Sequence, residues 1–404
     1  RRKDPARRYR SANAFADDIG RYLNSMPIVA RTDSWRYRAG KFVQRHVAAV
    51  SAAALVVALL AAFSIALSVQ NRAVIKERDT AQEVIQFLED IFMAHDPSRA
   101  RGADVTAEEI LAEGADRIQS NLGNRPEIQS ALMGTIGRVY YNLGEYPASE
   151  EMLQKALQLQ IQTSGDSHPS VAAIKNDLAE VLIRRAEYGL ATELLQQALA
   201  VNQLSNDGTS PLVATNLFNL ANVYLATGQL DEAEAAVRSS VAIFVQIADE
   251  YGLELAEAKS ALARILQVRG DLDQTESLLL EAIDILSASE GPDHPFMAYY
   301  LQNLGVLQRS KGDLVAAEQT LQLAVDATRR ILGEQHELLA IALVDQGMLL
   351  QMKGDYDEAA RVVRAAIALD IEIHGPRHPR VGLYETILGR ILHDSNDLEN
   401  AESS

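Results

Sequence analysis

The sequence contains no cysteine among its 404 residues. Disulfide bonds, thiolate metal sites and a cysteine nucleophile are therefore excluded, although a cysteine-free chain suits either redox compartment. Aromatic residues make up only 5% of the chain while hydrophobic residues reach 48%, so the apolar content is mostly Ala, Leu, Val and Ile. This mixture favours closely packed helices over sheets.

Basic residues are scarce over most of the chain. Residues 1–46 carry 12 Lys and Arg against 4 Asp and Glu, whereas the remainder carries 26 against 51. Phosphate binding needs clustered Lys and Arg, so the acidic majority argues against nucleic acid as a partner. The asymmetry indicates two different environments along one chain.

A single long segment, residues 47–69, lacks charge. As a helix it would measure about 34 Å, enough for a hydrocarbon core of about 30 Å, and it is too long for a typical buried helix or a signal peptide. The sequence therefore predicts a transmembrane helix in contact with membrane lipid. Five basic residues precede the segment and three follow it. This excess predicts that residues 1–46 lie in the cytoplasm and that the repeat array, residues 106–404, lies on the other side of the membrane.

Beyond residue 105 the sequence repeats with a fixed period. Turn-like positions recur every 42 residues, at Gly144, Ala186, Gly228, Gly270, Gly312, Gly354 and Asn396. A second motif, Gly-x-x-His with or without a following Pro, keeps the same step or a multiple of it, from Gly165, Gly291, Gly333 and Gly375. Two motifs in phase over so many intervals indicate a repeat architecture.

Each unit is predicted to be helix, tight turn, helix. A glycine with positive φ ends the first helix, and proline starts the next one where its missing N–H costs little. Small residues that let two helices approach closely precede the turn by seven residues, at Gly137, Ala179, Ala221, Ala263, Gly305, Gly347 and Gly389. Others follow it by five residues, at Ser149, Ala191, Ala233, Thr275, Ala317, Ala359 and Ala401.

This pattern resembles the tetratricopeptide repeat, as in Leu220-Ala-Asn-Val-Tyr224 and Ile136-Gly-Arg-Val-Tyr140. The family's usual unit has about 34 residues, and the 42-residue step is similar to the longer repeats of kinesin light chains. The resemblance implies an all-α superhelical solenoid over residues 106–404. A capping box, Thr106 to Glu109, opens its first helix. Residues 70–105 are predicted to be a connecting helix and loop.

Residues 1–25 resemble the C-terminal end of a bacterial serine/threonine kinase domain. The matching residues are Asp4, Pro5, Arg8, Tyr9 and Ser11. In that family the Arg and Asp are structural, and the Arg pairs with a Glu that would precede this chain. Residues 26–46 are then a basic juxtamembrane segment. The alternative is a generic basic amphipathic helix.

The chain carries no catalytic or cofactor site that we can identify. Glycine-rich loop, catalytic-loop and Asp-Phe-Gly motifs are missing, so the chain alone should not phosphorylate anything; ATP and Mg are implied only for a kinase domain outside it. Four recurring histidines, His168, His294, His336 and His378, fall in separate units. We therefore interpret them as loop structure and not as metal ligands.

Binding is expected on the inner side of the solenoid. In the resembled family the first helix of each unit lines a concave groove. Its inward positions here hold Arg138, Tyr141, Asn176, Glu180, Asn222, Arg264, Gln267, Gln302, Arg309 and Arg390, with Phe218, Ser260, Met348 and Gln351 in the same rows. These rows predict a protein or peptide ligand with acidic or amide groups. The alternative is ordinary solvated helix surface.

Together these features predict the membrane-anchored protein-binding or sensing region of a bacterial serine/threonine kinase. A competing hypothesis is a non-enzymatic membrane-tethered tetratricopeptide adaptor or scaffold. A cargo adaptor of the kinesin-light-chain type would leave the segment 47–69 unexplained.

Overall fold

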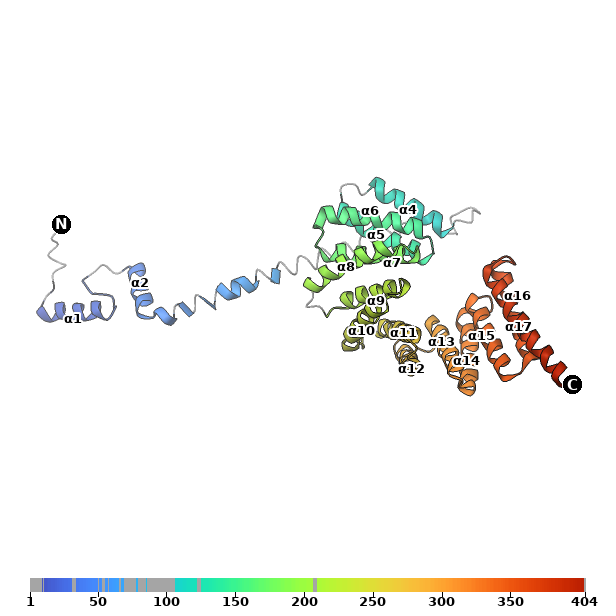
Figure 1. The fold of residues 1–404 in the computed structure, drawn as a ribbon. Coiled ribbons are helices and arrows are strands. Elements are labelled where there is room, and N and C mark those ends of the chain that lie inside the picture. Colours follow the sequence, from blue (N-terminus) through green and yellow to red (C-terminus); the bar gives the residue numbers. More distant parts are fainter. Residues whose placement is uncertain are drawn as a thin grey trace. The chain divides into compact units, whose positions relative to one another are not determined.

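The structure is a computed structural model, and its described residues divide into two compact units, 1–94 and 95–404 (Figure 1). Each unit is described by itself. The residues described are 9, 11–30, 34–49, 51–52, 55–56, 58–64, 67–68, 78, 85, 106–121, 125–205 and 209–402.

The second unit is built from helices that pack in antiparallel pairs, and the described residues contain no strand. In chain order they are α4 (Ala107–Asn121), α5 (Pro126–Asn142), α6 (Tyr146–Ser164), α7 (Pro169–Arg184), α8 (Tyr188–Ser205), α9 (Pro211–Ala226), α10 (Leu230–Gln246), α11 (Gly252–Arg269), α12 (Leu272–Ser289), α13 (Pro295–Lys311), α14 (Leu314–Leu332), α15 (Glu337–Lys353), α16 (Tyr356–His374) and α17 (Pro379–Glu402). Odd-numbered helices from α5 are the first helices of the units and even-numbered ones the second, which confirms the predicted all-α solenoid.

The predicted turn positions have the backbone that the sequence requires. Five of the seven are glycines with φ between 78° and 89°, at Gly144, Gly228, Gly270, Gly312 and Gly354. Ala186 adopts the same left-handed turn with φ 60°, although it carries a Cβ. A side chain is uncommon in this region, so the fold imposes the turn there against local preference.

The recurring histidines are helix N-caps. The Nδ1 atom of His168 accepts the backbone N–H of Ser170 at 3.3 Å, and His294, His336 and His378 bond in the same way. Proline follows three of these caps as the first helical residue. Capping satisfies one of the N–H groups that a helix leaves unpaired. No group of three or more possible metal ligands occurs among the described residues.

The predicted capping box is present at the start of α4. Thr106 and Glu109 exchange hydrogen bonds of 3.0 and 3.2 Å, each side chain accepting the backbone N–H of the other residue. This reciprocal pair satisfies two N–H groups at the helix start, as the sequence predicts.

Small residues hold the two helices of a unit together. A Cβ atom at Gly305 would lie 2.7 Å from the Leu321 side chain, and one at Gly347 would lie 2.4 Å from Val363. Where the facing position carries a hydroxyl, it bonds to the opposite backbone: Ser149 Oγ donates to the Gly137 carbonyl at 2.7 Å. The small-residue rows therefore mark the closest approach of the helices, as the sequence predicts.

The last predicted turn is wrong. Asn396 lies within α17, a single helix, together with Ala401. Gly389 is exposed, and a Cβ atom there would meet nothing within 4 Å. In the other units the chain reverses because a second helix packs against the first. Among the described residues no helix packs back after Asn396, so the helical backbone continues.

In the described part of the first unit, α1 (Ala12–Leu23) and α2 (Trp35–Arg45) are short helices. Asp18, on α1, is buried and accepts backbone N–H groups of Val29 and Ala30 at 2.8 and 2.9 Å, which ties the following loop to the helix. The kinase-like residues Asp4 and Arg8 lie outside the described residues. Most of residues 70–105 also lie outside them.

The predicted membrane span and the localisation built on it are contradicted. None of the helices in the described ranges is both long and apolar enough to cross a bilayer. Residues 50, 53, 54, 57, 65, 66 and 69 of the segment lie outside the described residues.

Candidate functional site

The first helices form the inner side of the array. Successive first helices touch one another at α5 and α7, α7 and α9, α9 and α11, α13 and α15, and α15 and α17. Successive second helices make no comparable contact within the described ranges. Stacked helical pairs that touch only through their first helices curve toward that side, so the helices that carry the predicted groove residues form the concave side of the array.

Several of the predicted ligand-binding residues are engaged with the neighbouring unit. Arg138 donates to Asp177 at 3.0 Å, and Arg390 donates to Gln351 at 3.2 Å. Asp345 is shared by two of them: it accepts Gln302 at 3.0 Å, and its carboxylate lies 3.4 Å from the guanidinium of Arg309. These pairs join one unit to the next and leave fewer free cations in the groove than the sequence predicts.

A buried amide network connects successive units in the middle of the groove. Asn176 donates to Glu180 at 2.9 Å, and Asn219 donates both to Asn176 at 3.1 Å and to Glu180 at 2.8 Å. Asn216 extends the network, donating to Asn176 at 2.9 Å and accepting from Asn202 at 2.7 Å. The network fixes the Glu180 carboxylate at the edge of the groove.

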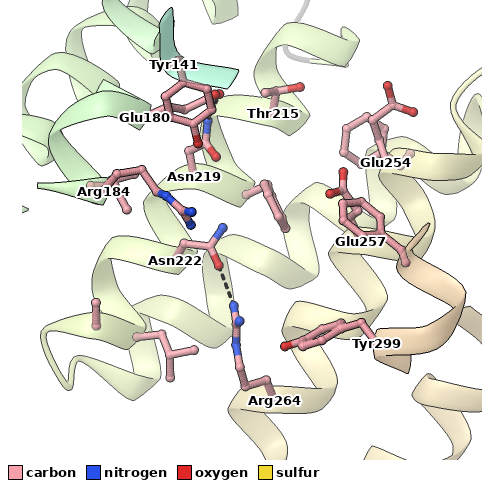
Figure 2. A pocket seen from close by; sticks show the side chains of 16 residues that line it. Tyr141, Glu180, Arg184, Thr215, Asn219, Asn222, Glu254, Glu257, Arg264 and Tyr299 are labelled. Atoms are coloured by element: carbon pink, nitrogen blue, oxygen red, sulfur yellow. Dashed lines mark hydrogen bonds between the residues drawn. The ribbon is translucent and has the colours of Figure 1, made fainter. Parts of the chain in front are cut away.

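The groove deepens into a cavity of about 800 Å³ beside this network. Figure 2 shows its polar side chains converging from successive first helices. Four predicted residues, Tyr141, Glu180, Asn222 and Arg264, line it, and so does Phe218. Arg264 donates to Asn222 at 2.8 Å, across one repeat period. The other predicted residues do not line the cavity; Gln267, for example, is exposed on α11.

Sequence reasoning missed much of the cavity wall. Five of the missed residues lie one and two helical turns further toward the helix N-terminus: Thr215, Glu257 and Tyr299 precede the turn position by 13 residues, and Glu254 and Phe296 precede it by 16. They continue the stripe formed by the positions three, six and ten residues before the turn. Extending that stripe would have found them, because helical positions three or four apart share one face.

The cavity carries more negative than positive charge near α11. Glu180, Glu254 and Glu257 face two guanidinium groups, those of Arg184 and Arg264. Arg184 donates to the Tyr146 hydroxyl at 3.1 Å, and no ion pair joins either arginine to Glu254 or Glu257 within the described part of the chain.

Burial acts on the protonation of these carboxyl groups. Partial burial is the main cause that raises the pKa of Glu257 to about 7, and the neighbouring carboxylates of Glu254 and Glu180 act in the same direction. Burial also raises the pKa of Glu180. The cavity therefore holds carboxyl groups that take up protons more readily than exposed ones do.

Comparisons with known families agree with this architecture. Residues 127–203 and 170–244 match a family model described as tetratricopeptide repeat, residues 255–296 match another with the same description, and residues 280–404 match the MalT-like TPR region. No curated protein sequence matches the chain.

Solved structures share the fold at low identity. Cut9 with Hcn1, of the APC/C, is 16% identical with a TM-score of 0.53, over 76% of this chain and 53% of that one. A Rap protein in complex with Competence and Sporulation Factor is 10% identical with a TM-score of 0.50, over 79% and 99%. A kinesin light chain with nearly identical TPR-like repeats from Podosopora anserina is 22% identical with a TM-score of 0.45, over 51% and 98%. The family models that match residues 127–244 and 255–404 show that the helical array of this chain is a solenoid of tetratricopeptide repeats.

Proposed function

We propose that the concave face of the array binds an extended peptide segment of a partner protein. The cavity of about 800 Å³ carries the proposal, since side chains of α5, α7, α9, α11 and α13 contribute to it. Its wall alternates aromatic rings, such as Phe218 and Tyr299, with amide and charged groups, such as Asn222 and Glu180. Apolar walls with a few fixed polar groups are typical of ligand pockets, and a site that spans several units suits an elongated ligand.

A peptide selection tests this proposal. Peptides would be selected from a random 12-residue display library with the full chain, and the affinity of the best synthetic peptide would be measured by fluorescence anisotropy. We expect the double substitution Asn222→Ala and Arg264→Ala to weaken binding at least about tenfold, because both residues line the cavity. The matched control is Arg238→Ala on α10, whose guanidinium pairs with Glu234 outside the cavity. Binding that survives the double substitution, or that depends on Arg238, contradicts the proposal.

We also propose that residues 1–25 form the end of a kinase domain. The apolar stripe of α1 supports this, because Phe15, Ile19, Tyr22 and Leu23 are between 44% and 75% exposed although they share one helix face. Such a face is typical of a helix that packs on a larger domain. The gene is the test: the reading frame before Arg1 should encode about 250 residues with the kinase Lys and Asp motifs. A frame without them favours the adaptor hypothesis, which shares the peptide-binding array.

A further inference from the structure

The cavity continues into a side pocket between α11 and α13. This pocket of about 110 Å³ shares Phe218, Glu257 and Tyr299 with the main cavity and adds Tyr300. It opens between α11 and α13. In the described array these are the one pair of successive first helices that do not pack against each other as the other pairs do. The wider step leaves room for a side chain to enter between two units.

One polar group in this pocket lacks a partner. Tyr300 is 2% exposed, and its hydroxyl makes no hydrogen bond to any described residue. Buried polar groups in proteins are nearly always hydrogen-bonded, so each exception needs an explanation. The hydroxyl oxygen is itself buried, and it belongs to a residue that lines the pocket, so a bound donor reaches it once the wall opens slightly.

The Glu257 carboxylate on the pocket wall forms no ion pair with a described residue. Glu254, on the adjoining cavity wall, also has no cationic partner among the described residues, and its carboxylate disfavours the charge of Glu257. The single guanidinium on the wall, that of Arg264, is directed toward Asn222, as Figure 2 shows. A positive charge placed beside Glu257 would relieve the repulsion between the two carboxylates.

Aromatic rings complete the wall. Phe218, Phe296 and Tyr299 line both the pocket and the main cavity. The face of an aromatic ring attracts a cation, and the attraction is stronger where water is excluded. The Glu257 carboxylate, an unused hydroxyl and three rings thus surround a space that suits one chemical group.

We propose that this side pocket binds the positively charged side chain, arginine or lysine, of the peptide in the groove. The inference rests on the proposed function and specifies the ligand of the same site. It differs from the acidic or amide ligand expected from the sequence, because Arg138, Arg309 and Arg390 are engaged between units. The guanidinium or ammonium group donates to Glu257 and the Tyr300 hydroxyl, and its alkyl stem lies against the rings.

Matched peptides test the proposal in the full chain. The probes are acetylated and amidated Ala-Ala-Xaa-Ala-Ala, where the central residue is arginine, lysine, citrulline or norleucine; citrulline and norleucine copy the shape of the first two without the charge. Binding is measured by isothermal titration at pH 8. We expect each basic peptide to bind at least about tenfold tighter than its neutral counterpart. Equal affinities, or no binding by any of the four, would overturn the inference.

Two substitutions assign the effect to this pocket. Glu257→Gln should reduce the ratio of basic to neutral affinity to near one, whereas Glu232→Gln, an equal charge change at an exposed position on α10, should leave it unchanged. Tyr300→Phe should weaken the basic peptides about threefold without lowering the unfolding midpoint, because the hydroxyl has no partner to lose. An unchanged ratio in Glu257→Gln contradicts the inference, while library peptides that depend on Asn222 and Arg264 would still support the peptide-binding function.

Discussion

Gly305 and Leu321 lie so close that a single methyl group on the glycine would overlap the leucine side chain. A Cβ atom there would be 2.7 Å from both the Cγ and Cδ2 atoms of Leu321 and 3.2 Å from its backbone nitrogen. The contact joins α13 to α14, the two helices of one unit. The backbone nitrogen is part of α14, so the leucine cannot simply swing away.

Gly305→Ala should therefore destabilise the array. The added methyl must push the helices apart or force Leu321 into a strained rotamer, at a cost of about 1–3 kcal/mol in the free energy of unfolding. Gly382→Ala is the control, since a Cβ atom at this helical glycine meets nothing within 4 Å. That substitution should stabilise by about 0.5–1 kcal/mol because alanine favours the helix. Urea unfolding measures both, and equal effects would refute the close-contact explanation.

Ala186 offers the opposite test. It occupies a turn with φ 60°, where the equivalent residue of every neighbouring described turn is glycine. Ala186→Gly removes the clash of the Cβ atom in the left-handed region and should raise the free energy of unfolding by about 0.5–1 kcal/mol, after the entropy that glycine adds to the unfolded chain. Gly228→Ala, the reciprocal change at φ 78°, should lower it by a similar amount. If both substitutions act in the same direction, φ does not control the turn.

The repeat was predictable because its causes are local. A left-handed turn selects glycine, a close helix contact selects a small residue, and an N-cap followed by a first helical residue selects His-Pro. Each choice recurs at the same step or at a multiple of it, so the register appears directly in the sequence. Asn396 matched the register by position alone. Within the described residues no second helix packs there, and such packing is a tertiary cause that leaves no mark at that residue.

The groove was only partly predictable for the same reason. The resemblance to tetratricopeptide repeats, counted back from the turn positions, implied Tyr141, Glu180, Asn222 and Arg264, which the structure brings to one cavity. It could not show that Arg138 is occupied by Asp177, since that pair depends on how successive units stack. Nor could it show the wider step between α11 and α13, which creates the side pocket lined by Tyr300.

The pKa of Glu257 predicts how stability depends on pH. The pKa of Glu257 in the folded chain is about 7, above the ordinary 4.5. Between pH 4.5 and pH 7, therefore, Glu257 keeps its proton in the folded state but has lost it in the unfolded state. The contribution of Glu257 to stability therefore falls as pH rises from about 4.5 to about 7. Glu257→Gln should be more stable than the wild type at pH 8, and the difference should vanish toward pH 4.5.

Urea unfolding at pH 5, 6, 7 and 8 measures this dependence. Glu232→Gln serves as the control because Glu232 is exposed on α10, and its offset from the wild type should not vary over this range. A constant offset for Glu257→Gln at all four values would show that the carboxylate keeps its ordinary pKa.

Two asparagines on α9 provide the last prediction. Asn219 is 6% exposed and donates hydrogen bonds to Asn176 at 3.1 Å and to the Glu180 carboxylate at 2.8 Å. Asn219→Asp removes both donors and places a second carboxylate against Glu180. The free energy of unfolding should fall by about 1–3 kcal/mol at neutral pH. Because each carboxylate raises the pKa of the other in the folded state, the loss should shrink as pH falls and a proton bridges the pair.

Asn222→Asp makes the same substitution three residues later, where the partner has the opposite charge. The side-chain oxygen of Asn222 accepts a hydrogen bond from the Arg264 guanidinium at 2.8 Å. An aspartate at this position would form a charge-assisted hydrogen bond in its place. Its free energy of unfolding should stay equal to the wild type or rise at neutral pH. Chemical denaturation of both variants at pH 5 and pH 7 decides the matter. Equal losses of unfolding free energy at the two positions would mean that burial of the new charge, and not the partner it faces, sets the cost. Only a loss confined to Asn219→Asp agrees with the network that holds Glu180 at the edge of the groove.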